Sequence, residues 1–190
     1  MARNKEDKRK RILDAAAKLF AEQPFHKVLL DQVASAARVG KGTLYLYFKN
    51  KEELYIAMRL NGFQKLIAAL EQGLAEHEND PEAQLAGIID RLAGRLLEHP
   101  IMFKFWREAI IRMPSNMDWQ EQLNELFELI EGVIQNGIEK GVFKDANPAA
   151  TARYIAGLIR TLSMFRPEDN TTDELCRHAK QFVLNGLQAA

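Results

Sequence analysis

The chain has 190 residues, 47% of them hydrophobic and 27% charged, and its formal net charge is zero. This composition supplies ample apolar material for the core of one compact unit or two small ones. The single cysteine, Cys176, excludes an internal disulfide framework and fits a reducing cytoplasm. No apolar run approaches the roughly 18 residues of a membrane span, and the charged N-terminus lacks the apolar stretch of a signal peptide.

The charge is unevenly distributed along the chain. Residues 1–51 hold 12 Lys and Arg against 5 Asp and Glu, a net charge of +7, and the remaining residues carry −7. We call the basic residues 1–51 the head and the acidic remainder the body. This charge distribution indicates that the head binds a polyanion and that the body does not. From the charge alone, a solvated run of charged residues at one terminus stays an open alternative.

Three short helices are predicted in the basic head. After a polar segment, residues 1–8, the apolar spacing of residues 12–20 marks an amphipathic helix that ends just before Pro24. Apolar residues at i, i+3, i+4 and i+7 from Leu30 predict a second helix, and residues 41–48 form a short third one. The last two are separated only by a tight turn at residues 38–40. This is the pattern of a helix-turn-helix, whose second helix enters the major groove of DNA.

Residues 39–55, VGKGTLYLYFKNKEELY, resemble the signature of the tetracycline-repressor (TetR) family of bacterial transcription regulators. The match is dense from about residue 10 to residue 60. In that family the short helix reads the operator, and the rest of the chain binds a small effector and dimerises. The resemblance therefore implies a homodimer that binds double-stranded DNA at a palindromic operator.

Three positions depart from the family's usual pattern. Arg38 stands in the turn where Gly is usual, and a non-Gly residue in a left-handed turn costs about 1 kcal/mol unless Gly40 absorbs the bend. Gly40 itself stands where Ser is usual. Val28 stands where a Thr or Ser usually caps the second helix and touches a phosphate, and such a capping hydroxyl contributes about 1 kcal/mol.

A long helix is predicted to follow the helix-turn-helix. Asn50 is a fitting N-cap with Glu53 three residues later, and apolar steps of three and four continue to about residue 78. This helix starts in the head and ends in the body, so we expect it to couple the two.

The body is predicted to contain several more helices with clear ends. Asp80-Pro81 and Asn147-Pro148 each indicate an N-cap followed by Pro at the first helical position. Thr171 and Glu174 form the pattern of a capping box for the last helix. Gly141 is placed to end the helix that runs to Lys140. No segment alternates with period two. The prediction is an all-α chain of about nine helices, with a DNA-binding domain at 1–50 and an effector-binding and dimerisation domain at 51–190.

The third helix and its surroundings supply the expected DNA contacts, because the N-terminal residues of a recognition helix lie nearest the bases. The residues expected to contact base edges are Lys41, Thr43 and Tyr45, and Gly42 is expected to permit a close approach of the backbone. The residues expected to contact phosphates are Tyr47, Lys49 and Lys51, and Gln32 could reach a phosphate or a base edge. For the two tyrosines, packing against a neighbouring helix is the alternative.

An apolar segment in the body is the expected effector site. Residues 101–113 form a helix that is apolar on nearly all sides, and such a helix must be buried all round or line an apolar cavity. The expected effector contacts are Phe63, Met102, Phe103, Trp106, Arg107, Ile110, Phe127 and Met164. An ordinary hydrophobic core is the alternative, and Arg107 is as well explained by a surface ion pair.

The last two helices are the expected contact between subunits, since small residues there allow helices to approach closely. The expected residues are Ala152, Ile155, Ala156, Ile159, Leu175, Phe182 and Val183. Packing within one chain is the alternative.

The sequence thus predicts a cytoplasmic DNA-binding repressor that leaves its operator when a small apolar or aromatic effector binds. The four histidines are isolated, so we expect no metal site, and neither a cofactor motif nor a nucleophile–base pair predicts an enzyme. A ligand-independent DNA-binding or scaffolding protein is the alternative.

Overall fold

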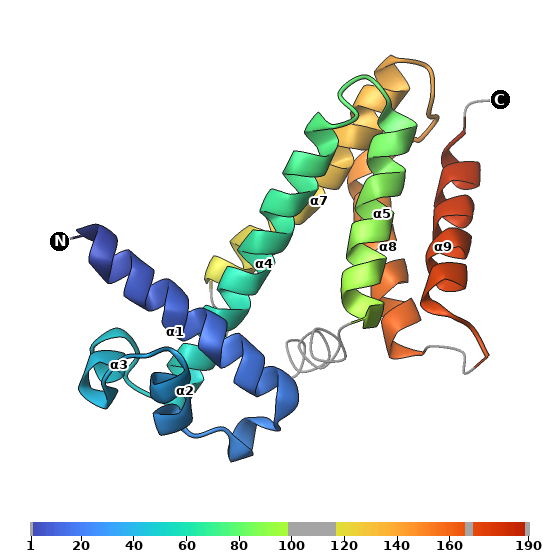
Figure 1. Cartoon of the computed structure of the whole chain (residues 1–190). Helices are drawn as coiled ribbons and strands as arrows, with labels where there is room; N and C mark the ends of the chain where they lie inside the picture. The colour runs from blue at the N-terminus through green and yellow to red at the C-terminus, as the bar shows by residue number, and fades with distance from the viewer. Residues whose placement is uncertain (1, 99–116, 166–168, 189–190) are drawn as a thin grey trace. The chain divides into compact units, whose positions relative to one another are not determined.

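The computed structural model describes residues 2–98, 117–165 and 169–188. Across these ranges the chain is all-α, as predicted (Figure 1). The described residues form eight α-helices and one short 3-10 helix, where about nine helices were expected for the whole chain. It divides into two compact units, Met1–Gln64 and Lys65–Ala190. The division lies inside a long helix, α4 (Lys51–Ala75), rather than at its start, where the sequence placed the domain boundary.

The first unit is a small helical bundle. Its elements are α1 (Ala2–Glu22), the 3-10 helix η1 (Phe25–Lys27), α2 (Leu30–Ala36), α3 (Lys41–Tyr47) and the first part of α4. Its fully buried side chains include Ile12, Leu13, Val28, Val33, Leu44 and Leu54. The expectation that residues 1–8 precede the first helix is wrong, because α1 already begins at Ala2.

The second unit packs its helices around α5 (Pro81–Glu98). This helix contacts α7 (Met117–Glu139), α8 (Pro148–Met164) and α9 (Thr172–Leu187) (Figure 1). Helix α7 also packs on α8. The apolar helix predicted at residues 101–113 lies outside the described residues.

Most predicted helix ends in this unit are confirmed by their hydrogen bonds. The Asp80 carboxylate accepts the Ala83 N–H at 2.9 Å, and the Asn147 side chain accepts the Ala150 N–H at 3.1 Å. Thr171 and Glu174 exchange hydrogen bonds as a capping box, and the bonds donated by Thr171 lower the pKa of the Glu174 carboxyl. All of these partners lie three residues apart.

Helix α7 ends in a Schellman motif. Gly141 has φ of +71° and its N–H bonds to the Ile138 carbonyl, while the Val142 N–H bonds to the Gly137 carbonyl at 2.8 Å. The buried ring of Phe143 then folds back onto Gly137, where any Cβ would meet it. Gly137 is therefore required for a close approach that the sequence alone did not reveal.

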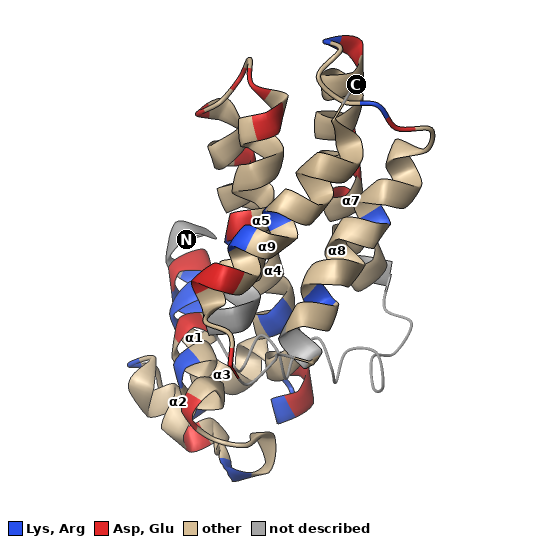
Figure 2. Cartoon of the chain, turned by 90° about the vertical axis from the view of Figure 1, so that its right-hand side faces the viewer, with Lys and Arg blue, Asp and Glu red and all other residues tan. Residues whose placement is uncertain are grey.

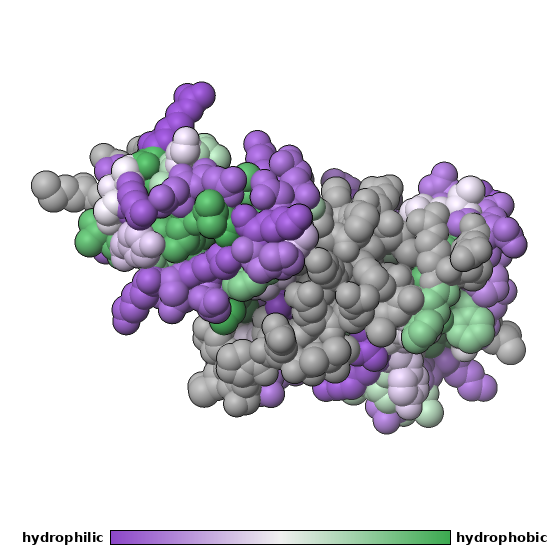
Figure 3. All heavy atoms as spheres, turned by 90° about the horizontal axis from the view of Figure 1, so that it is seen from below, coloured by the Kyte–Doolittle hydropathy of each residue, from purple (hydrophilic) through white to green (hydrophobic). Residues whose placement is uncertain are grey.

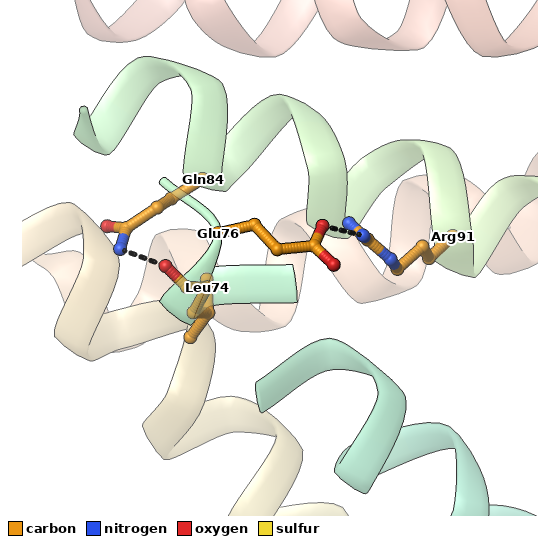
Figure 4. A network of polar contacts seen from close by, with 4 residues as sticks. All are labelled: Leu74, Glu76, Gln84 and Arg91. Carbon is orange, nitrogen blue, oxygen red and sulfur yellow. Dashed lines mark hydrogen bonds and ion pairs between the residues drawn. The ribbon is translucent and has the colours of Figure 1, made fainter. Parts of the chain in front are cut away.

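The C-terminal part of α4 is bonded to α5 by two side chains (Figure 4). The amide of buried Gln84 donates to the Leu74 carbonyl at 3.0 Å, and the Arg91 guanidinium pairs with Glu76 at 3.2 Å. The same guanidinium lies over Gly73, where an added Cβ would displace it. These contacts hold the end of α4 against α5 within the second unit.

Candidate nucleic-acid interface

The turn between α2 and α3 is a second Schellman motif. Arg38 has φ of +54°, in the left-handed region, and the Val39 N–H bonds to the Ala34 carbonyl at 3.0 Å. Gly40 has extended backbone angles, φ −68° and ψ 149°, and is the N-cap of α3. The alternative that Gly40 absorbs the bend is therefore wrong. Arg38 takes the strained conformation at the position where a glycine would be free of strain.

Helix α3 presents one face to the core and the opposite face to solvent. Leu44 and Phe48 are buried. Lys41, Gly42 and Tyr45 are exposed, and Thr43 is half-buried. The most exposed side chain is Leu46, at 84%, which was not among the predicted DNA contacts. Its position could have been read from the spacing, because it lies opposite the Leu44–Phe48 face of a 3.6-residue helix.

Lys41 does not stand alone at the start of α3. Its ammonium lies 2.9 Å from the Asp31 carboxylate on α2, and both side chains are largely exposed. The hydrogen bond that the Lys41 ammonium donates to the Asp31 carboxylate raises the pKa of Lys41. The ammonium that the sequence assigned to a base edge therefore has an acidic neighbour in the DNA-free chain.

Tyr47 is bonded to the N-terminal part of α1. Its hydroxyl donates to the Lys5 carbonyl at 2.9 Å, and the Arg9 guanidinium lies over the adjacent Phe48 ring, 5.8 Å from its centre. This is the packing role that was left open for Tyr47. It also keeps the basic N-terminal part of α1 beside α3, where Lys and Arg alternate with Asp and Glu along the helix (Figure 2).

Lys51 has an internal role. Its ammonium donates to the carbonyls of Phe25 (2.9 Å) and Val28 (3.2 Å) and lies 4.6 Å from the centre of the Phe25 ring. The predicted phosphate contact of Lys51 is corrected accordingly, because three-dimensional packing places the loop before α2 over the side chain. Lys49 keeps an exposed side chain, and its backbone N–H is the one that bonds Glu53.

Gln32 acts at the start of α2. Its side-chain oxygen accepts the N–H of Leu29, the N-cap residue, at 3.0 Å. This bond is one half of a capping box. The other half is absent, because the N-cap residue Leu29 has no side-chain hydroxyl to accept a backbone N–H. Val28, at the position where the family usually has Thr or Ser, is fully buried instead.

The predicted effector residues fall largely outside the described part of the chain. This holds for Met102, Phe103, Trp106, Arg107 and Ile110, and for the side chain of Met164 in α8. Phe63 is buried in α4. Phe127 is half-buried on α7, with the Arg153 guanidinium 4.9 Å from its ring centre.

Six of the seven residues predicted to join two subunits are buried inside the single chain, namely Ala152, Ile155, Ala156, Ile159, Leu175 and Val183. The intramolecular alternative therefore describes them, because these faces of α8 and α9 turn toward the unit's own core. The exposed apolar side chains of the two helices are Tyr154 (72%) and Phe182 (66%), and Phe165 (73%) follows α8.

Tyr154 and Phe182 line an open groove of about 230 Å³ between α8 and α9. Leu158 and the buried side chains of Ile155 and Val183 form its apolar floor and walls. Lys144 and Asp145, in the segment that precedes α8, add polar groups at one end.

Two family models match the chain. Residues 12–58 match the model for bacterial regulatory proteins of the tetR family, and residues 78–187 match the tetracyclin repressor-like C-terminal domain. The chain belongs to the TetR family. It is thus a helix-turn-helix DNA-binding transcriptional regulator with a tetracyclin repressor-like C-terminal domain, as the signature at residues 39–55 implied.

Relatives and solved structures that resemble this chain match it over most of its length. The HTH-type transcriptional regulator YhgD of Bacillus subtilis is 31% identical over 96% of this chain and 98% of its own. The fatty acid metabolism regulator protein of the same organism is 29% identical over 80% and 79%. The crystal structure of Bacillus subtilis FadR in complex with stearoyl-CoA covers 93% of this chain and 98% of its own, with 23% identity and a TM-score of 0.71. Reduced NemR of Escherichia coli covers 97% and 98%, with 18% identity and a TM-score of 0.80.

TetR-family proteins are DNA-binding regulators rather than enzymes. Within the described ranges, no His, Cys, Asp and Glu side chains group in a way that holds a metal ion. In the same ranges no helix is long and apolar enough to cross a bilayer.

Proposed function

We propose that this TetR-family chain is a cytoplasmic homodimeric repressor that binds an inverted-repeat operator and is released by an apolar acyl effector. The observation that carries the DNA-binding part is the helix-turn-helix at residues 30–47, set in a head with a net charge of +7. Lys41, Gly42, Thr43 and Tyr45 of α3 enter the major groove. Lys49 contacts a phosphate.

The proposed contact between subunits is the exposed face of α8 and α9, not their buried face. Tyr154 and Phe182 are large, apolar and exposed, and they flank the apolar groove between the two helices. A second copy of the chain that places the same residues in this groove would bury them under a two-fold axis. Sedimentation of Tyr154→Glu/Phe182→Glu tests this, with Tyr154→Phe/Phe182→Leu as the conservative control. A dimer that survives the acidic pair contradicts the assignment.

The proposed effector class is a long-chain acyl-CoA. The fatty acid metabolism regulator of Bacillus subtilis is 29% identical, and the FadR structure holds stearoyl-CoA. The aromatic and Met-rich composition of residues 101–113 fits an acyl chain. The coupling runs through α4, whose C-terminal part is held to α5 by Gln84 and Arg91. A 100-fold loss of DNA affinity requires about 2.7 kcal/mol of coupling.

Selection of a random duplex library on the purified protein tests the DNA function, and the recovered operator then tests the effector. We expect an inverted repeat with half-sites about one helical turn apart, roughly 34–36 Å. We also expect the logarithm of the DNA affinity to fall with the logarithm of the salt concentration, with a slope (the salt slope) of about −5 to −9. Stearoyl-CoA should release the operator, whereas CoA alone should not. Recovery without a motif contradicts operator binding. A recovered operator that no acyl-CoA of any chain length releases favours the ligand-independent alternative.

A further inference from the structure

The solvent-facing side of α3 has an apolar centre. On a helix of 3.6 residues per turn, Leu44 and Phe48 define the buried side, and Gly42 and Leu46 lie opposite them. Thr43 and Tyr45 flank this centre. Gly42 has no side chain, and nothing lies within 4 Å of the position its Cβ would take. Leu46 is therefore the one side chain at the middle of the solvent-facing side of α3, and Leu46 is 84% exposed.

Leu46 belongs to a unit whose surface carries many charged and polar side chains. Figure 3 shows hydrophobic surface set among hydrophilic side chains on this unit. The head carries a net charge of +7, which favours a polyanionic partner over an apolar protein surface. Helix α3 has seven residues and is about 10 Å long, and an α-helix of about 10–12 Å diameter enters a major groove about 12 Å wide.

The major groove offers one apolar group, the C5-methyl of thymine. We propose that Leu46 is a specificity-determining residue that packs on a thymine C5-methyl in each half-site of the operator. This inference rests on the proposed operator binding and adds one base preference to it. The polar neighbours in α3 can select bases by hydrogen bonds, and Leu46 selects thymine by burying a methyl group that cytosine lacks.

The test replaces each thymine of the selected operator, one position at a time, with deoxyuridine. Deoxyuridine pairs as thymine does and lacks only the methyl group. For the wild-type protein we expect one half-site position at which the replacement weakens binding about fourfold, the effect of one buried methyl, and about 16-fold when both half-sites are changed. For Leu46→Ala the same replacement should change nothing, because the packing partner is gone.

Two further variants keep the result unambiguous. Leu46→Met retains an apolar side chain and should retain the methyl preference. Leu29→Ala removes another exposed leucine of the same unit, 59% exposed at the start of α2, and should retain the full effect of the methyl group. Since both leucines are exposed, we expect the alanine variants to melt close to the wild-type temperature.

Each outcome decides a separate point. Equal losses on deoxyuridine for the wild type and Leu46→Ala overturn the role of Leu46 while leaving operator binding intact. An operator with no methyl-sensitive thymine does the same. A selection that recovers no motif overturns both operator binding and the thymine contact.

Discussion

Lys41, the first residue of α3, forms an exposed ion pair with Asp31 of α2, with the ammonium nitrogen 2.9 Å from a carboxylate oxygen. The pair spans the turn of the helix-turn-helix. A carboxylate at this position repels the phosphates that the head approaches, and it competes with DNA for the Lys41 ammonium.

Replacing Asp31 by Asn should strengthen DNA binding. The substitution removes the repulsion and releases Lys41, so we expect about a fivefold gain in affinity at low salt that shrinks as salt is added. Fluorescence anisotropy with a labelled operator measures it. Glu22→Gln, which makes the same charge change at the end of α1, is the control. Equal gains for the two variants would mean that only net charge matters.

Substitution of Lys51 should affect stability and substitution of Lys49 should affect phosphate binding, although the sequence analysis predicted phosphate contacts for both. Lys51→Met removes the hydrogen bonds to the Phe25 and Val28 carbonyls and should cost about 1.5–3 kcal/mol of unfolding free energy. Lys49→Met should leave stability unchanged and reduce the magnitude of the salt slope by about 2 per dimer, one phosphate per subunit. Urea unfolding and salt titrations measure the two effects. The reverse pattern would restore Lys51 to the phosphate contacts.

Arg38→Gly should stabilise the first unit by about 1 kcal/mol, because Arg38 occupies the left-handed region with φ of +54°. Thermal unfolding of the purified variant measures the gain. Arg38→Ala removes the same charge without relieving the backbone and should show no gain. Stabilisation by alanine as large as by glycine would show that charge repulsion in the basic head, and not backbone strain, is what the substitution relieves.

Two glycines of α7 should respond to alanine in opposite directions. Gly137→Ala places a methyl group against the buried Phe143 ring and should destabilise the protein by about 1–3 kcal/mol. Gly132 lies in the same helix with nothing within 4 Å of its Cβ position, so Gly132→Ala should stabilise by about 0.5–1 kcal/mol. Chemical denaturation compares them. If both variants gain stability, the Phe143 ring does not pack on Gly137 in solution.

The sequence alone determined the features whose partners lie close along the chain. The helix ends at Asp80, Asn147 and Thr171 are set by side chains that bond a backbone N–H three residues later, and Gly141 ends α7 within one turn. The helix-turn-helix and its signature are equally local. Hence the all-α fold, the DNA-binding head and the TetR family could be predicted from the residues.

Only the tertiary structure decided which partner a side chain takes from elsewhere in the chain. Tyr47 bonds the carbonyl of Lys5, and Lys51 bonds those before α2, so neither role is visible from residue type. Likewise, α8 and α9 each have two apolar faces. The packing of α5 and α7 buries the face with Ile155 and Ile159 and leaves Tyr154 and Phe182 outside. Amphipathic spacing shows that a helix face is apolar, and only the neighbouring helices determine whether it is covered within the chain.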